Sequence, residues 1–185
     1  VGDYLRRYPD VAVSCWFLDR VVQLVEEGVD VAVRIGELPD STLVATRVGR
    51  VRRVLCASPA YLARQGTPQS PRDLAQHQIV AASGISPSTE WRFADGAQVR
   101  VVPRLTTTTN DAAVDAALAG LGITRLLSYQ VAHELAKRRL VALLVEHEPA
   151  PLAVHVVHRE QRQGSPRVRA FVDLAVAALR GDAAL

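Results

Sequence analysis

A run of hydroxyl side chains precedes an alanine-rich segment near the middle of the sequence. Thr106–Thr109 leads into Asn110, a residue type that often caps a helix, and residues 111–119 favour a helix. A helix N-terminus carries partial positive charge and unpaired N–H groups, so hydroxyl groups beside it complete a receptor for a carboxylate or another anion. We therefore select Thr108, Thr109 and Asn110 as candidate ligand-binding residues. The alternative remains that threonine simply suits a strand and asparagine simply caps the helix.

A second candidate for anion binding ends an apolar run at residues 29–35. Arg34 and Gly36 stand at the carboxyl end of this predicted strand, which is where open α/β sheets bind their ligands. The Arg34 guanidinium could hold a carboxylate with two hydrogen bonds. It could equally form a salt bridge to Glu37 or Asp40, and the sequence leaves both alternatives open.

Aromatic side chains follow another apolar run, at residues 11–16. Trp16 and Phe17 stand at its end, where they could form the apolar wall that small-molecule pockets usually have. Asp19 comes two residues after Phe17 and is suited to cap a helix that Gly28 would end.

Other reactive residue types form no catalytic or metal-binding motif. Two of the five histidines, His155 and His158, point to opposite faces of a predicted strand and cannot easily share a metal ion. The sequence has no Gly-x-Ser-x-Gly element and no Gly-x-x-x-x-Gly-Lys phosphate loop. Glu146 and Glu148 fit a solvated loop better than a catalytic carboxylate pair. We therefore expect no enzymatic activity, no metal and no cofactor.

Strands and helices that would position these candidates alternate along the chain. The strand, helix and strand within residues 11–35 are typical of a βαβ unit in a parallel sheet. Asp95-Gly96 between two strand-like runs indicates a hairpin, and the polar segment 65–78 is typical of a boundary between structural units. The remaining predicted strands lie at 42–48, 51–57, 101–107, 123–126, 140–145 and 152–157, and the helices at 1–8, 59–64, 111–119, 128–137 and 165–179.

Composition indicates a globular protein. The 185 residues are 49% apolar and 22% charged. The net charge is only +3 and the arginines are dispersed, which disfavours a nucleic-acid-binding face. No apolar run is long enough to cross a membrane, and no export signal is recognised at the first residues. Cys15 and Cys56 lie in apolar runs, so we expect two buried, reduced thiols and a reducing compartment, the cytoplasm.

Five motifs together resemble the effector domain of LysR-type transcriptional regulators. Their order and spacing agree across nearly the whole chain. The motifs are Tyr8-Pro9-Asp10-Val11, Asp30-Val31-Ala32-Val33-Arg34-Ile35-Gly36, Ala57-Ser58-Pro59-Ala60-Tyr61-Leu62, Ala119-Gly120-Leu121-Gly122-Ile123 and Arg167-Val168-Arg169-Ala170-Phe171-Val172.

This resemblance implies an α/β fold of two Rossmann-like lobes joined by two crossovers, like that of the type 2 periplasmic binding proteins. Lobe I would comprise residues 1–77 and 157–185, and lobe II residues 78–156. The resemblance also implies that a first strand and an N-terminal winged helix-turn-helix domain lie upstream of Val1. That domain would bind promoter DNA, and the protein would form dimers, or tetramers at full length.

In such a regulator, a small anionic effector would lie in the cleft between the lobes. The matching positions in this chain are Trp16, Phe17, Asp19, Arg34, Gly36, Thr108, Thr109, Asn110, Gly122 and Ile123. The sequence alone leaves two alternatives: a solute-binding receptor of the periplasmic type, and an enzyme built on the same scaffold. An upstream helix-turn-helix would favour the regulator, and an upstream cleavable leader would favour the receptor.

Overall fold

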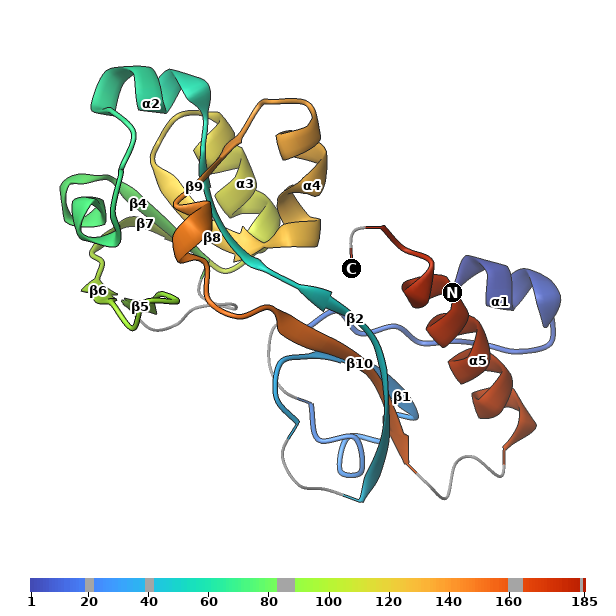
Figure 1. Cartoon of the computed structure of the whole chain (residues 1–185). Helices are drawn as coiled ribbons and strands as arrows, with labels where there is room; N and C mark the ends of the chain where they lie inside the picture. Colours follow the sequence, from blue (N-terminus) through green and yellow to red (C-terminus); the bar gives the residue numbers. More distant parts are fainter. Residues whose placement is uncertain (19–21, 39–41, 83–88, 160–164, 184) are drawn as a thin grey trace. The chain divides into compact units, whose positions relative to one another are not determined.

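The computed structural model describes residues 1–18, 22–38, 42–82, 89–159, 165–183 and 185, which form two compact units (Figure 1). Unit 1 contains Val1–Val51 and Leu152–Ala183 together with Leu185, and unit 2 contains Arg52–Pro151. The chain therefore crosses between the units twice. The boundaries differ from those expected, because residues 52–77 belong to unit 2 and residues 152–156 to unit 1.

Strand pairing explains these boundaries. Strand β3 (Arg53–Ala57) pairs with β8 (Ile123–Leu127) and β9 (Val141–Leu143), so it joins the sheet of unit 2. The segment predicted as a crossover, residues 65–78, lies inside unit 2 and contains the 3₁₀ helix η1 (Pro71–Gln76). The polar composition of residues 65–78 indicated a surface connection. It did not indicate which sheet the strands before and after this segment would join.

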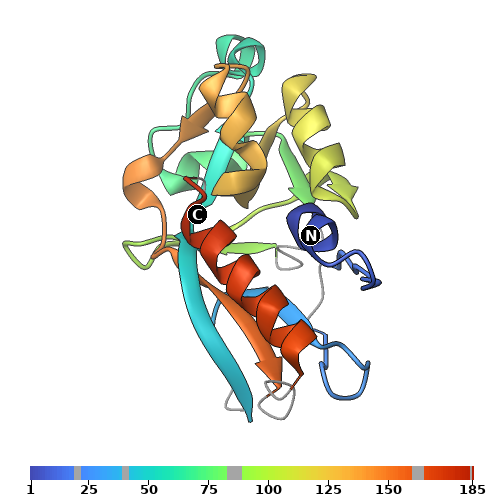
Figure 2. The same cartoon turned by 90° about the vertical axis from the view of Figure 1, so that its right-hand side faces the viewer.

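Unit 1 is built on a three-stranded antiparallel sheet. Its order is β1 (Val31–Ile35), β10 (Leu152–Arg159) and β2 (Leu43–Val51). Helix α5 (Pro166–Arg180) packs against β2 and β10 (Figure 2). The βαβ unit predicted for residues 11–35 is wrong, since β1 pairs antiparallel with β10 and lies at the sheet edge.

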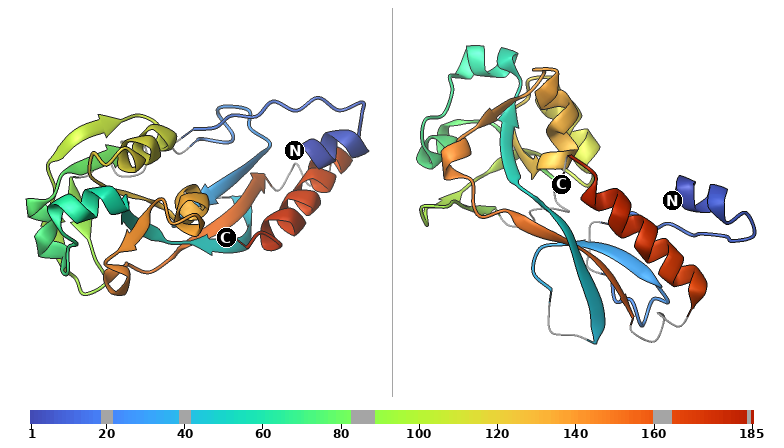
Figure 3. Two further views of the ribbon diagram at one scale, coloured as in Figure 1. Left: turned by 90° about the horizontal axis from the view of Figure 1, so that it is seen from above. Right: turned by 45° about the vertical axis from the view of Figure 1, so that its right-hand side comes forward.

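The short helix α1 (Gly2–Arg7) lies beside α5 (Figure 3). Tyr4 joins the two helices: its ring centroid is 5.1 Å from that of Phe171, and its hydroxyl donates a hydrogen bond to the Arg167 carbonyl at 3.0 Å. This contact holds a segment that is far from α5 in sequence.

Residues 11–16 form no strand, contrary to the prediction. A strand exists only where a neighbouring strand pairs with its backbone groups, and this run has no such neighbour among the described residues. Asp19 lies outside the described residues. The predicted helix that follows it is not observed at Leu24–Gly28, which forms turns.

The two cysteines have different environments, although both were predicted to be buried. Cys56 lies in the core of unit 2, and burial raises the pKa of its thiol to about 12. Cys15 is exposed, because the strand expected to bury it does not form.

Thiol labelling should therefore distinguish the two cysteines. We expect a disulfide reagent at pH 8 to modify only Cys15 in the folded protein, because the thiolate is the reactive form and Cys56 is both buried and protonated. Cys15→Ser should abolish the native reaction, whereas Cys56→Ser should leave it unchanged. Rapid modification of both thiols without denaturant would contradict this assignment.

Unit 2 is built on a five-stranded sheet with the order β7 (Pro103–Thr107), β4 (Ile79–Ala82), β8, β3 and β9. Helices α3 (Asn110–Leu118) and α4 (Ser128–Ala136) cover one face, and the predicted hairpin, formed by β5 (Glu90–Arg92) and β6 (Gln98–Arg100), covers the other (Figure 1). The further elements are α2 (Pro59–Gln65) and η2 (Val145–His147).

Small side chains allow α3 to lie close to the sheet. Ala113, Ala116 and Ala117 are buried against Val54 and Leu126. On the other sheet face the hairpin buries Trp91, Phe93, Val99 and Val101 in a second core cluster. The sequence-based prediction of both elements is confirmed.

A buried tyrosine joins α2 to the start of β4. The Tyr61 hydroxyl accepts a hydrogen bond from the Gln78 backbone N–H at 2.9 Å and lies 3.1 Å from Nδ1 of His77. Burial lowers the pKa of His77 below its usual 6.5, and Asp73 offsets this only in part.

The stability of the protein should therefore fall in mildly acidic solution. Because the folded-state pKa of His77 is lowered, the unfolded chain binds a proton more readily, so the contribution is complete above about pH 6.5 and is lost as the pH falls below that value. Urea unfolding between pH 7.5 and 5 measures this loss. His77→Gln should show a smaller pH dependence than the wild type, and equal slopes would contradict the assignment.

Candidate functional site

The start of α3 is shaped by three consecutive threonines. The Thr107 hydroxyl donates to the Thr109 carbonyl at 2.9 Å, which fixes the turn between β7 and α3. The Thr109 hydroxyl accepts from the Ala112 N–H at 3.4 Å and so caps the helix. Thr108 and Thr109 are exposed. The first turn of α3 therefore presents hydroxyl and N–H groups at the surface of unit 2.

Asn110 is the first residue of α3 and not its cap, as the sequence had indicated. Thr109 takes the cap position because its backbone is extended, with φ −121° and ψ 148°, and its hydroxyl can reach the N–H three residues later. The Asn110 side chain is thereby released from capping. Its Oδ1 is buried and has no hydrogen-bond partner among the described residues, which makes it an acceptor available for a ligand N–H or O–H.

Gly122 and Ile123 lie away from the start of α3. Along β4, Ile79 pairs with both Pro103 and Ile123, whereas Ala82 pairs with Thr107. Ile79 and Ala82 are three residues apart along β4, so about 10 Å separates the position of Ile123 from that of Thr107. The structure does not bring these two residues together with Thr108–Asn110.

Gly122 instead permits close backbone packing. A Cβ atom there would lie 2.4 Å from the Gln78 carbonyl oxygen, the same oxygen that accepts a hydrogen bond from the Ile123 N–H at 2.8 Å. Ile123 is fully buried. Both residues have a clear structural role in joining β8 to β4.

The candidates in unit 1 are partly exposed. Trp16 and Phe17 are accessible, with 93% of Phe17 exposed. The Arg34 guanidinium donates to the Val22 carbonyl, and no ion pair between Arg34 and Glu37 is found among the described residues. Gly36 has φ +105°, and its N–H donates to the Ala153 carbonyl at 2.9 Å. Asp40, like Asp19, lies outside the described residues.

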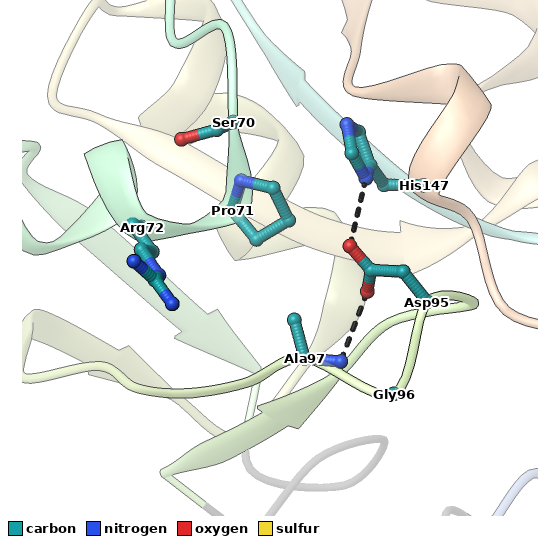
Figure 4. A pocket seen from close by; sticks show the side chains of 7 residues that line it. All are labelled: Ser70, Pro71, Arg72, Asp95, Gly96, Ala97 and His147. Carbon is teal, nitrogen blue, oxygen red and sulfur yellow. Dashed lines mark hydrogen bonds and ion pairs between the residues drawn. The ribbon is translucent and has the colours of Figure 1, made fainter.

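A pocket of about 500 Å³ in unit 2 was not predicted from the sequence (Figure 4). His147 Nδ1 lies 3.3 Å from Asp95 Oδ2, and the Ala97 N–H donates to Asp95 Oδ1 at 2.9 Å. The Ala97 N–H first, and His147 to a lesser extent, hold the pKa of Asp95 below its usual value. The lining residues are Ser70, Pro71, Arg72, Asp95, Gly96, Ala97 and His147.

This pocket joins three segments that are distant in sequence, which is why it was missed. The only signal was Asp95-Gly96, interpreted as a hairpin turn. Within the described ranges, no three His, Cys, Asp or Glu side chains are grouped so that they could hold a metal ion. No helix formed by those residues is long and apolar enough to cross a membrane.

Comparison with known proteins decides the family. A family model described as the LysR substrate binding domain matches residues 1–180. The chain belongs to the LysR substrate-binding domain family. It is similar to the HTH-type transcriptional regulator YhjC of Escherichia coli K12, with 33% identity over 177 residues that cover 93% of this chain and 59% of YhjC. The chain thus spans less than two thirds of that relative.

Solved structures of LysR-type regulators share this fold. The regulatory domain of CrgA from Neisseria meningitidis has a TM-score of 0.84 and 30% identity, covering 96% of this chain and 89% of that domain. The full-length virulence activator AphB of Vibrio cholerae has a TM-score of 0.83 and 25% identity, covering 96% of this chain and 61% of AphB. The predicted type 2 periplasmic-binding-protein-like α/β fold is confirmed, and these neighbours are regulators and not periplasmic receptors.

Proposed function

We propose that this LysR substrate-binding domain senses a small anionic effector and passes the binding event to a DNA-binding domain of the same regulator. The observation that supports the proposal is the arrangement of polar groups at the start of α3. There, exposed Thr108 and Thr109 hydroxyls adjoin the first N–H groups of a nine-residue helix, whose partial positive charge favours an anion.

The chemistry at Asn110 narrows the class of effector. Backbone N–H groups of α3 suit a carboxylate, while Asn110 Oδ1, which has no hydrogen-bond partner in the part of the chain that the structure describes, suits a hydrogen-bond donor. A small carboxylate that also carries a hydroxyl or amino group satisfies both. Contacts from Trp16, Phe17, Asp19, Arg34 and Gly36, and a position of the effector between the two units, stay predictions.

The wider role follows from the regulator family. We infer that the complete protein works in the cytoplasm, forms dimers and tetramers, and contacts promoter DNA through a helix-turn-helix domain. It performs no catalysis on its effector. For signalling, the effector must bind one arrangement of the protein more tightly than another, since equal affinity would shift no equilibrium.

A thermal-shift screen of small hydroxy and amino carboxylates tests this function. We expect at least one compound to raise the melting temperature of the wild type, and Thr109→Val to weaken its binding about tenfold or more, the effect of losing one hydrogen bond to a charged group.

Two matched variants serve as controls for Thr109→Val. Thr109→Ser keeps the hydroxyl and should keep the response, and Thr106→Val changes an exposed threonine of β7 and should also keep it. An equal response in Thr109→Val and the wild type would place the ligand elsewhere.

A further inference from the structure

The pocket between η1, η2 and the turn of the β5–β6 hairpin contains charged groups of both signs. Figure 4 shows Arg72 on one side of it, and Asp95 and His147 on the other. The volume of about 500 Å³ lies within the range of ~300–1,000 Å³ that is typical of sites for small molecules. All of its lining residues belong to unit 2, so one compact unit forms the pocket.

Asp95 supplies a negative charge at the hairpin turn. Its Oδ1 accepts the Ala97 N–H at 2.9 Å and its Oδ2 lies 3.3 Å from His147 Nδ1. These contacts hold the pKa of Asp95 below its usual value, so the carboxylate is ionised at neutral pH. A carboxylate has about four acceptor positions, and 48% of the Asp95 side chain is exposed. Asp95 can therefore accept further hydrogen bonds from a ligand.

Backbone hydrogen bonds hold this side of the pocket in place. The Ala94 N–H donates to the His147 carbonyl at 3.0 Å, which joins the hairpin turn to η2. Within the turn, the Gly96 N–H donates to the Phe93 carbonyl at 3.1 Å. A ligand that binds to groups already ordered in this way pays little for ordering them.

Arg72 supplies the positive charge. Its side chain is exposed and forms no ion pair with a carboxylate in the part of the chain that the structure describes. The adjacent carboxylate is engaged elsewhere, because Asp73 Oδ2 accepts the backbone N–H groups of Gln69 at 2.9 Å and Ser70 at 2.8 Å. The Arg72 guanidinium is therefore available to hold a ligand carboxylate with two hydrogen bonds.

We propose that this pocket binds a free amino acid in its zwitterionic form, with the ligand carboxylate on Arg72 and the ligand ammonium group on Asp95. A zwitterion offsets both charges of the pocket, whereas a simple acid or a simple amine would pair with one of them and lie near the other, which has the same sign as its own. This inference goes beyond the effector site proposed above, because the hairpin and α3 pack on opposite faces of the same sheet.

Backbone NMR titration with each of the standard amino acids, at neutral pH and constant ionic strength, tests this proposal. We expect at least one of them to cause saturable chemical-shift changes at the amides of Arg72, Gly96 and Ala97. Analogues of that amino acid that lack the ammonium group or the carboxylate should bind about tenfold more weakly or worse, because each loses one charge-assisted contact. No saturable change at these amides with any amino acid, or equal binding of either analogue, would overturn the proposal.

Charge-removing variants assign the two contacts. Asp95→Asn keeps an Oδ1 acceptor for the Ala97 N–H and so retains the hairpin turn. This variant and Arg72→Gln should each weaken binding about tenfold or more, while Arg100→Gln, which changes an exposed arginine of β6, should leave it unchanged. Unchanged binding in Asp95→Asn or Arg72→Gln would contradict the proposal. The amides at the start of α3 appear in the same spectra, so a response there is read separately from a response in this pocket.

Discussion

Gly122→Ala is expected to lower the free energy of unfolding by at least about 2 kcal/mol. The new Cβ would lie 2.4 Å from the Gln78 carbonyl oxygen and 2.8 Å from its carbonyl carbon, and both atoms belong to the backbone. Relief of this clash requires β4 and β8 to separate where Ile123 donates to Gln78. Urea unfolding followed by circular dichroism measures the loss.

Gly181→Ala provides the control for this substitution. The nearest atom to an added Cβ there is 3.6 Å away, an ordinary contact, and the backbone has φ −85°, which any residue adopts. Its stability should lie within about 0.5 kcal/mol of the wild type. If Gly122→Ala unfolds at the same urea concentration as Gly181→Ala, the close packing of β4 and β8 is not as described.

Trp91→Ala is expected to be the other severe substitution, with a loss of about 3–5 kcal/mol. Trp91 is almost completely buried, and it packs with Phe93, Val99 and Ile123 between the hairpin and the sheet. Its removal would leave a large cavity. It would also remove the cation–π contact between Arg125 and the indole ring, whose centroid lies 4.6 Å from the guanidinium carbon. Circular dichroism during urea unfolding is the suitable measurement, since the tryptophan signal is altered.

Trp91→Phe is the matched control, because it keeps most of both contributions. Phenylalanine retains most of the apolar volume and an aromatic face beneath Arg125, so we expect a loss of only about 1–2 kcal/mol. Alanine and phenylalanine variants of equal stability would contradict the role assigned to the buried ring.

Two elements of unit 2, the β5–β6 hairpin and helix α3, were predicted from short sequence motifs. Asp95-Gly96 indicated the hairpin, and the alanine-rich segment after Asn110 indicated α3; both are present. Their success has a simple physical reason, because turn geometry and helix capping are determined within a few residues.

The pairing of strands that are far apart in the sequence could not be predicted from local patterns. The apolar run 11–16 has the composition of a strand but has no strand partner among the described residues, so Cys15 is exposed. The antiparallel pairing of β1 with β10 joins segments about 120 residues apart, as Val33 opposite Val156 shows. No local pattern encodes such a pairing.

The candidate site was predicted in part. Thr108–Asn110 lie at the start of α3 as expected, although Thr109 and not Asn110 is the cap. Gly122 matches the family motif but lies at the other end of the strands, because a glycine can be required for backbone packing as well as for ligand access.

Backbone NMR titration with a carboxylate found by the thermal-shift screen tests the central claim most directly. If the start of α3 receives the effector, the largest saturable chemical-shift changes within unit 2 will occur at the amides of Thr108–Ala112, and Thr109→Val will reduce them. Saturable changes elsewhere in unit 2 that leave these amides unmoved would contradict an effector site at the start of α3.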